Sequence, residues 1–232
     1  MKKLLLLTSI VITGLYFTDS IYAQDCDFYF PTEKGTIVET TSYDKKNKET
    51  DKSYLEVLDY SKNNGVTEVK IESRIDEEGI DTLGLHQFTV RCENSEFYIN
   101  MDSYLDKDAM SQYQGMDIEI DSDNMTIPSN LSKGQTLNDG RVSLSISNSG
   151  IKMMTMTVNV TDRKVEGFEK VITPAGTFNC VKISFTSEMK MIFKIKTSGV
   201  QWFSKDIGVV KSESYDKKGK LSGTSMITKI TK

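Results

Sequence analysis

The sequence has little of several residue types on which catalysis and architecture often depend. Its 232 residues include one histidine, one tryptophan, three prolines and three cysteines. A single histidine, His86, excludes metalloproteases of the His-Glu-x-x-His type and zinc sites with several histidine ligands. Neither charge dominates, because 29 Lys and Arg stand against 33 Asp and Glu. The sequence therefore predicts no basic surface for phosphates, and nucleic acid is not expected as a partner.

Motifs of the common enzyme classes are also missing. The sequence contains no Gly-x-Ser-x-Gly elbow, no Gly-x-Gly-x-x-Gly motif and no phosphate loop ending in Gly-Lys-Ser/Thr. The carboxylates are scattered, so no pair stands out for cutting sugars. His86 lies out of phase with the apolar positions around it, which indicates an exposed strand residue. We therefore expect a non-catalytic protein that uses no cofactor.

The N-terminal segment has the pattern of a secretory signal peptide. Lys2 and Lys3 precede an apolar run, and Ala23 supplies the small residue before a cleavage site. A membrane anchor needs about 20 apolar residues, whereas this run stops at Asp19. We predict a signal peptide at residues 1–23 and a mature chain that begins at Gln24. The mature chain is expected to be exported, periplasmic or extracellular, with no integral membrane segment.

If the chain is exported, its three cysteines are in an oxidising environment, where disulfides form. Cys180 lies inside a strand pattern, which favours a small buried side chain. Cys26 and Cys92 are therefore predicted to form a disulfide that ties the mature N-terminus to a strand in mid-chain. Lipidation of Cys26 is not expected, because Asp25 precedes it where a bacterial lipobox has a small residue.

Alternation of apolar and polar residues dominates the mature sequence and predicts strands. One face holds apolar side chains at every second position from Val181 to Ile195, apart from Ser187. This length indicates either one long bent strand or two strands joined with little turn. Only residues 102–114 have helical spacing, behind a cap at Asp102 or Ser103. Further strands are predicted at 36–43, 54–60, 66–75, 85–92, 96–101, 116–120, 142–147, 154–160, 165–173, 200–203, 209–214 and 222–230.

Turn residues such as Asn63-Asn64-Gly65, Asn148-Ser149-Gly150 and Pro174-Ala175-Gly176 separate these strands at hairpin positions. The predicted fold class is all-β and mainly antiparallel, either a single strongly curved sheet or an open barrel-like meander, with one short helix. No linker divides the chain, so residues 24–232 are expected to form one domain.

The chain contains one internal repeat. Residues 38–48 align without gaps with residues 210–220, and seven of the eleven pairs are identical. The repeat represents either a duplicated binding loop with Lys-rich tips at Lys45-Lys46 and Lys217-Lys218, or two solvated hairpin turns with the same turn chemistry.

Methionine and phenylalanine gather in two strand regions, which indicates a site for an apolar molecule. Such flexible, polarisable side chains line adaptable apolar pockets, although an ordinary core filled by Met gives the same pattern. The predicted apolar wall consists of Met154, Met156, Phe185, Met189, Met191 and Phe193.

Two further features have a structural and a functional interpretation. Asp117, Glu119, Asp121 and Asp123 share one face of a predicted strand and could bind a metal, but the spacing favours charges that protect a sheet edge. Trp202 could stack on a sugar if exposed. The turn at Gly208 favours burial, with Trp202 anchoring the sheet.

Two segments together resemble a known family. Thr173-Pro174-Ala175-Gly176-Thr177-Phe178 is similar to its hairpin, and the segment from Trp202-Phe203 to Gly208-Val209-Val210-Lys211 is similar to its strand pair. The family consists of exported proteins of unknown function from Gram-negative bacteria and is defined as a domain of unknown function. The resemblance implies a strongly curved antiparallel sheet and residence in the cell envelope. It implies no catalytic residues.

The sequence predicts a non-catalytic exported envelope protein that binds an apolar or lipid-like ligand within a curved sheet. One alternative is a structural or assembly factor that binds another envelope protein through a strand edge or the Lys-rich rim loops. The other alternative is a carbohydrate-binding module that uses an exposed Trp202 together with tyrosines.

Overall fold

The computed structural model describes residues 26–77, 80–105, 113 and 115–232, with the backbone alone at 77, 80–85, 103 and 104. The predicted signal peptide at residues 1–23 lies outside this part of the chain. The described strands are β1 (Ile37–Asp44), β2 (Glu49–Asn63), β3 (Val66–Glu77), β4 (Ile80–Glu93), β5 (Glu96–Ile99), β6 (Asp117–Asp123), β7 (Met125–Pro128), β8 (Gly140–Asn148), β9 (Ile151–Thr173), β10 (Gly176–Lys190), β11 (Lys194–Ser204), β12 (Gly208–Tyr215) and β13 (Leu221–Thr231).

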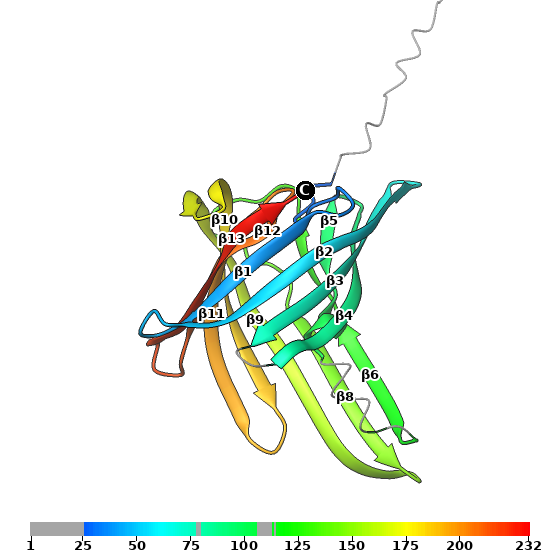
Figure 1. Cartoon of the computed structure of the whole chain (residues 1–232). Helices are drawn as coiled ribbons and strands as arrows, with labels where there is room; N and C mark the ends of the chain where they lie inside the picture. The colour runs from blue at the N-terminus through cyan, green and yellow to red at the C-terminus, as the bar shows by residue number, and fades with distance from the viewer. Residues whose placement is uncertain (1–25, 78–79, 106–112, 114) are drawn as a thin grey trace, which may run out of the picture.

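These strands form one 13-stranded sheet in the order β6-β8-β9-β10-β11-β12-β13-β1-β2-β3-β4-β5-β7. Each pairing among the described strands is antiparallel. The sheet curls into a nearly closed, barrel-like shape (Figure 1). The predicted fold class, all-β and antiparallel with a strongly curved sheet, is confirmed.

The two edge strands of the sheet, β6 and β7, are separated in sequence by Asn124 alone. The Asn138 side chain reinforces this seam, because its Nδ2 donates to the Asn124 carbonyl at 2.9 Å and its Oδ1 accepts from the Thr126 amide at 2.8 Å. Buried Arg163 donates to the carbonyls of Thr126 and Asn138. These hydrogen bonds link β7 to the segment before β8 and to β9 across the open side of the curled sheet.

The long alternation from Val181 to Ile195 belongs to two strands. β10 ends at Lys190, a tight turn covers residues 191–193, and β11 begins at Lys194. The predicted strands at 154–160 and 165–173 are instead one strand, the 23-residue β9. β9 bends where its register with β10 shifts at Ser184/Thr186 and at Lys182/Ile183, since a bulge lets a strand turn a corner without ending.

The predicted helix at 102–114 lies largely outside the described residues. The described part is a 3₁₀ turn, Met101–Tyr104, capped by the Asn100 side chain, which accepts from the Asp102 amide at 2.9 Å. An Asn at the end of a strand can accept the first free amide of such a turn. The predicted helix cap at Asp102 or Ser103 stays a prediction, because most of the helix lies outside the described residues.

The interior consists of three apolar clusters. The main cluster includes Phe97, Ile71 and Phe203, and the second lies between β8, β9 and Met101. The third brings the upper part of the β9–β10 hairpin against β12, β13 and β1, with Val171, Val210 and Ile227 among its members. Here "upper" and "lower" mean the two ends of the sheet as Figure 1 draws it.

Candidate functional site

The N-terminal segment closes the upper end of the sheet. Phe28, Tyr29 and Phe30 all pack their rings against Phe97, with centroids 5.3, 5.7 and 5.9 Å away. Tyr29 also meets Phe203 at 6.0 Å, edge to face. Burial raises the pKa of the Tyr29 hydroxyl well above its usual range, with the Asp27 charge as a second cause. The segment is thus part of the main core.

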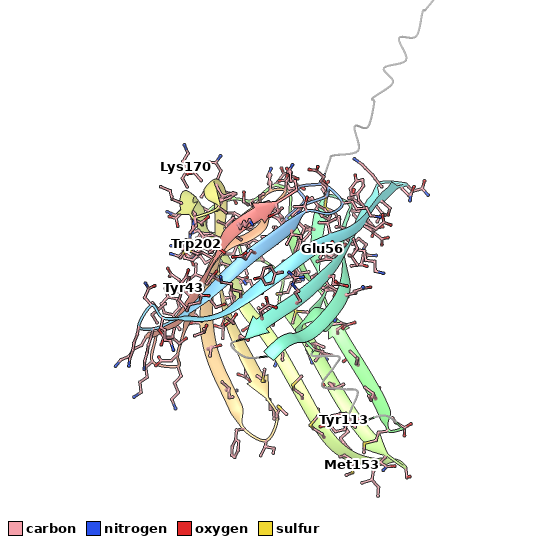
Figure 2. All side chains as sticks on the ribbon, in the orientation of Figure 1. Tyr43, Glu56, Tyr113, Met153, Lys170 and Trp202 are labelled. Atoms are coloured by element: carbon pink, nitrogen blue, oxygen red, sulfur yellow. A yellow bond between two sulfur atoms is a disulfide. The ribbon has the colours of Figure 1, made fainter. Side chains whose placement is uncertain are left out.

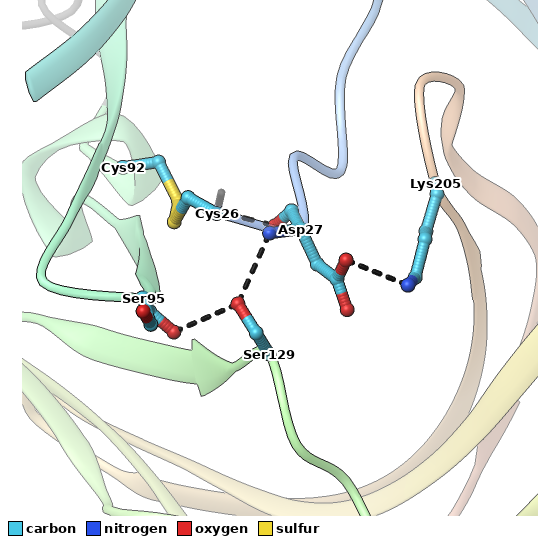
Figure 3. The surroundings of a disulfide bond; sticks show 6 residues. All are labelled: Cys26, Asp27, Cys92, Ser95, Ser129 and Lys205. Atoms are coloured by element: carbon cyan, nitrogen blue, oxygen red, sulfur yellow. Dashed lines mark hydrogen bonds and ion pairs between the residues drawn. A yellow bond between two sulfur atoms is a disulfide. The ribbon is translucent and has the colours of Figure 1, made fainter. Parts of the chain in front are cut away.

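A disulfide between Cys26 and Cys92 anchors this segment in the structure, with Cα atoms 6.1 Å apart (Figure 3). The Asp27 amide donates to Ser129 Oγ at 3.0 Å, and the Asp27 carboxylate pairs with Lys205 Nζ at 2.6 Å. The segment is therefore tied to β4, to the loop after β7 and to the β11–β12 turn.

An open groove of about 920 Å³ lies beside this anchored segment. It runs between the β9–β10 hairpin and the β11–β12 turn. Its apolar side chains include Tyr29, Phe168, Phe178 and Ile207. Its lysines are Lys170 and Lys205, and Figure 2 shows Lys170 at the upper end of the molecule. Glu169 contributes one carboxylate, so the groove combines an apolar lining with two lysines and one acidic side chain.

Phe168 and Glu169 line both this groove and a second hollow of about 730 Å³. The Phe168 side chain is 60% exposed although it lies in the middle of a strand. Lys133 and Lys182 add positive charge to the second hollow, where Ser184 Oγ donates to Glu166 at 2.7 Å. The exposed ring therefore borders two cavities, each lined by both lysine and glutamate side chains.

Trp202 lies behind the groove and is only 4% exposed. Lys182 and Lys211 place their ammonium groups 4.9 and 4.6 Å from its ring centroid, and its Nε1 donates to Glu169. The burial predicted from the turn at Gly208 is confirmed. Because its faces are already covered, Trp202 is not available for stacking on a sugar.

The polar groups next to Trp202 form a charged network. Lys211 Nζ and the Tyr215 hydroxyl donate to Glu213 at 2.6 and 2.5 Å. Burial by itself would raise the pKa of Glu213, but these hydrogen bonds and the Lys211 charge outweigh it, so the pKa is lowered. The hydrogen bond to Glu213 raises the pKa of Tyr215 to about 12, with burial as a further cause.

Cys180 also lines the groove and is a buried free thiol. Burial and, secondarily, the charge of Glu169 raise its pKa to about 11. A thiol with this pKa remains protonated at neutral pH and is a poor nucleophile. Its place in the apolar lining agrees with the prediction of a small buried side chain.

The residues of the predicted apolar wall lie in two different environments. Met154, Met156 and Phe185 are half-buried and pack against the second cluster. The space that remains beside Phe185 is about 10 Å³, which is no larger than a water molecule requires. Met189, Met191 and Phe193 are exposed on the β10–β11 hairpin.

The two segments of the internal repeat form matching turns, which we call the lysine turns (residues 44–48 and 216–220). Asp44 Oδ1 accepts from the amides of Lys46 and Lys48 at 2.8 and 2.9 Å. Asp216 repeats this pattern with the two corresponding lysines at the same distances. These backbone hydrogen bonds lower the pKa of both carboxyl groups. The turns lie side by side in Figure 1, because β13 pairs with both β1 and β12.

The acidic stripe from Asp117 to Asp123 lies on β6, an edge strand, as its edge-protection interpretation predicts. Within the described residues, no group of three His, Cys, Asp or Glu side chains could hold a metal ion. His86 is half-buried and stacks on Phe88 at 5.7 Å. The expectation of an exposed histidine is thus wrong, because the neighbouring ring covers one face of the imidazole. Among the described residues no helix is long and apolar enough to cross a membrane.

Sequence reasoning missed the groove and the aromatic segment that borders it. Phe168 alternates in phase with exposed Ile172, and an apolar residue on a solvent face was the available signal. The contribution of Tyr29 depends on how the chain enters the sheet, which no periodicity reveals.

Comparison with known proteins finds solved structures with a similar fold and a matching family model. A protein from Bacteroides fragilis, assigned as exported and described as having a YmcC-like fold, is 26% identical and superposes with a TM-score of 0.73 over 89% of this chain and 100% of its own. A protein from Parabacteroides distasonis, assigned as a lipoprotein, is 21% identical, with a TM-score of 0.74 over 90% of this chain and 100% of its own. None of the curated proteins matches the chain. The DUF3108-like family model matches residues 33–227, and the chain therefore belongs to the DUF3108-like family.

Proposed function

We propose that the chain is a non-catalytic envelope protein that binds an apolar, lipid-like molecule with an acidic head group in the groove beside the N-terminal segment. The groove carries this proposal, because its volume of about 920 Å³ falls within the range of typical small-molecule sites. Similarity to proteins assigned as exported or as lipoproteins supports a place in the envelope, where such ligands are available.

The lining of the groove favours an amphiphile over a sugar or a nucleotide. Phe168, Phe178 and Ile207 present rings and branched carbons, whose burial against an acyl chain is favourable by about 25 cal/mol per Å². Lys170 and Lys205 can approach a carboxylate or phosphate at the mouth. Lys205 already has a partner in Asp27, so Lys170 is the stronger candidate for the acidic head group.

The direct test is binding of a fluorescent fatty acid, with two exposed phenylalanines as a matched pair. Phe168→Asp places a carboxylate in the groove and is expected to weaken binding by about tenfold or more. Phe193→Asp makes the same change on the β10–β11 hairpin and should leave the affinity unchanged. Equal affinities for wild-type protein and Phe168→Asp, or no binding of the probe at all, would overturn the proposal.

A further inference from the structure

The lower end of the sheet gathers hairpin turns, four of which lie wholly within the described residues. In an antiparallel meander alternate turns fall at the same end, so the β8–β9, β10–β11, β12–β13 and β1–β2 turns share the end opposite the groove. Two of them carry exposed apolar side chains, and we call these the apolar tips (residues 148–153 and 191–193). The other two are the lysine turns. Figure 1 shows the apolar tips at the bottom and the lysine turns at the left.

The apolar tips expose more hydrophobic surface than a hairpin turn needs. Ile192 is 89% exposed, Phe193 79% and Met153 62%, and Figure 2 shows Met153 at the lower extremity. β9 also extends beyond the end of β10, because Lys190 pairs with Thr157 while β9 begins at Ile151. The β8–β9 tip thus projects beyond the β10–β11 tip. Contiguous exposed apolar groups of this kind mark interaction sites.

Positive charge lies next to the β10–β11 tip, whereas the β8–β9 tip has Lys152 within it and the acidic strand β6 beside it. Lys190 and Lys194 flank the β10–β11 turn, and Lys152 lies between the exposed residues of the other tip. Lys194 pairs with Glu188 at 2.7 Å. The lysine turns add Lys45, Lys46, Lys48, Lys217, Lys218 and Lys220. The acidic stripe lies on β6, which β8 and β9 separate from β10. The β10–β11 hairpin and the lysine turns therefore form the basic part of this end.

We propose that the lower end docks on an anionic phospholipid membrane, with the apolar tips in the interface and the lysines on lipid phosphates. Interfacial binding requires apolar surface together with electrostatic attraction to anionic head groups, and this end supplies both. Two apolar tips suit a soft lipid surface better than a protein partner, whose interface needs a packed, complementary area above about 1,000 Å². This proposal is independent of the groove, which lies at the other end.

The test is co-sedimentation of the purified mature protein with vesicles of phosphatidylcholine alone or mixed with phosphatidylglycerol. Wild-type protein is expected to bind the mixed vesicles more tightly, and added salt should weaken that binding because exposed charges are screened. The double variant Ile192→Asp, Phe193→Asp should bind at least about tenfold more weakly, because each lost apolar side chain makes the free energy of partitioning into the membrane less favourable. The double variant Lys217→Glu, Lys218→Glu should weaken binding to the mixed vesicles and leave binding to phosphatidylcholine vesicles unchanged.

Ile172→Asp is the matched control, because Ile172 is 80% exposed on the β9–β10 hairpin at the upper end. It should bind vesicles as wild type does. Fluorescence of the single, buried Trp202 verifies that each variant is folded. Absence of binding to mixed vesicles, or equal loss in Ile172→Asp and the double variant, would overturn the proposal. Capture of an envelope protein that depends on the apolar tips, without vesicle binding, would replace it with the assembly-factor alternative.

Discussion

Phe185 and Gly199 form a contact whose energy can be measured by a double-mutant cycle. They are cross-strand partners on β10 and β11. A Cβ added at Gly199 would lie 2.4 Å from Phe185 Cζ and 2.8 Å from its Cε1. The ring therefore occupies the space that any other residue at position 199 would need. Gly199→Ala must push the ring out of its place against the second cluster.

The expected loss in the free energy of unfolding for Gly199→Ala is about 1–3 kcal/mol, the usual range for overpacking. Phe185→Ala alone should cost about 3 kcal/mol or less, because the ring is only half-buried. In the Phe185→Ala background the clash is gone. Gly199→Ala should then stabilise the protein by about 0.5–1 kcal/mol, since glycine is unfavourable inside a strand.

Urea unfolding followed by Trp202 fluorescence measures all four proteins of this cycle. The predicted outcome is a change of sign: alanine at position 199 destabilises in the presence of the ring and stabilises in its absence. Additive effects of the two substitutions would refute this reasoning, because they would mean that the ring does not fill the space above Gly199.

Two further predictions concern the N-terminal anchor and the network at Trp202. The intact mass of the mature chain should be 2 Da below its reduced value, and an unchanged mass would contradict the disulfide. Reduction should lower the free energy of unfolding by about 4 kcal/mol, because Cys26 and Cys92 are 66 residues apart. Glu213→Gln should cost about 1 kcal/mol at neutral pH. Because the folded-state pKa of Glu213 is lowered from 4.5, this difference should be full above pH 4.5 and shrink as the pH falls through the folded-state value; a constant difference in urea unfolding at pH 3–7 would contradict it.

The strands could be predicted from sequence because buried and exposed residues alternate along a half-buried strand, and a few residues are enough to show this period. β8 shows why: Val142, Leu144 and Ile146 are buried and the residues between them are not. β7 was missed because its four residues, Met125–Pro128, are too short to establish a period. The sequence left open whether a turn interrupts the run from Val181 to Ile195, because Met191 and Phe193 continue the alternation of β10.

The groove could not be predicted, because its wall comes from segments far apart in sequence. Tyr29 reaches it only through the path of the N-terminal segment, and Ile207 only through the register between β11 and β12. The apolar wall was inferred from the residue types in two strand regions. Residue types alone do not show how deeply each side chain is buried. Phe185 and Phe193 belong to the same alternating run, but one packs against the second cluster and the other lies at a hairpin tip.

The internal repeat contains information that the turn geometry alone does not require. The turns need Asp44 and Asp216 as acceptors, and a residue that tolerates positive φ, which Asn47 (63°) and Gly219 (73°) provide. The lysines contribute only their backbone amides to these hydrogen bonds, so many other residues would serve equally well in the turn. Their side-chain charges are therefore available for the membrane docking proposed above. The two lysine turns lie side by side and present the same pattern of positive charges. On an anionic lipid surface these charges would contact the lipid phosphates.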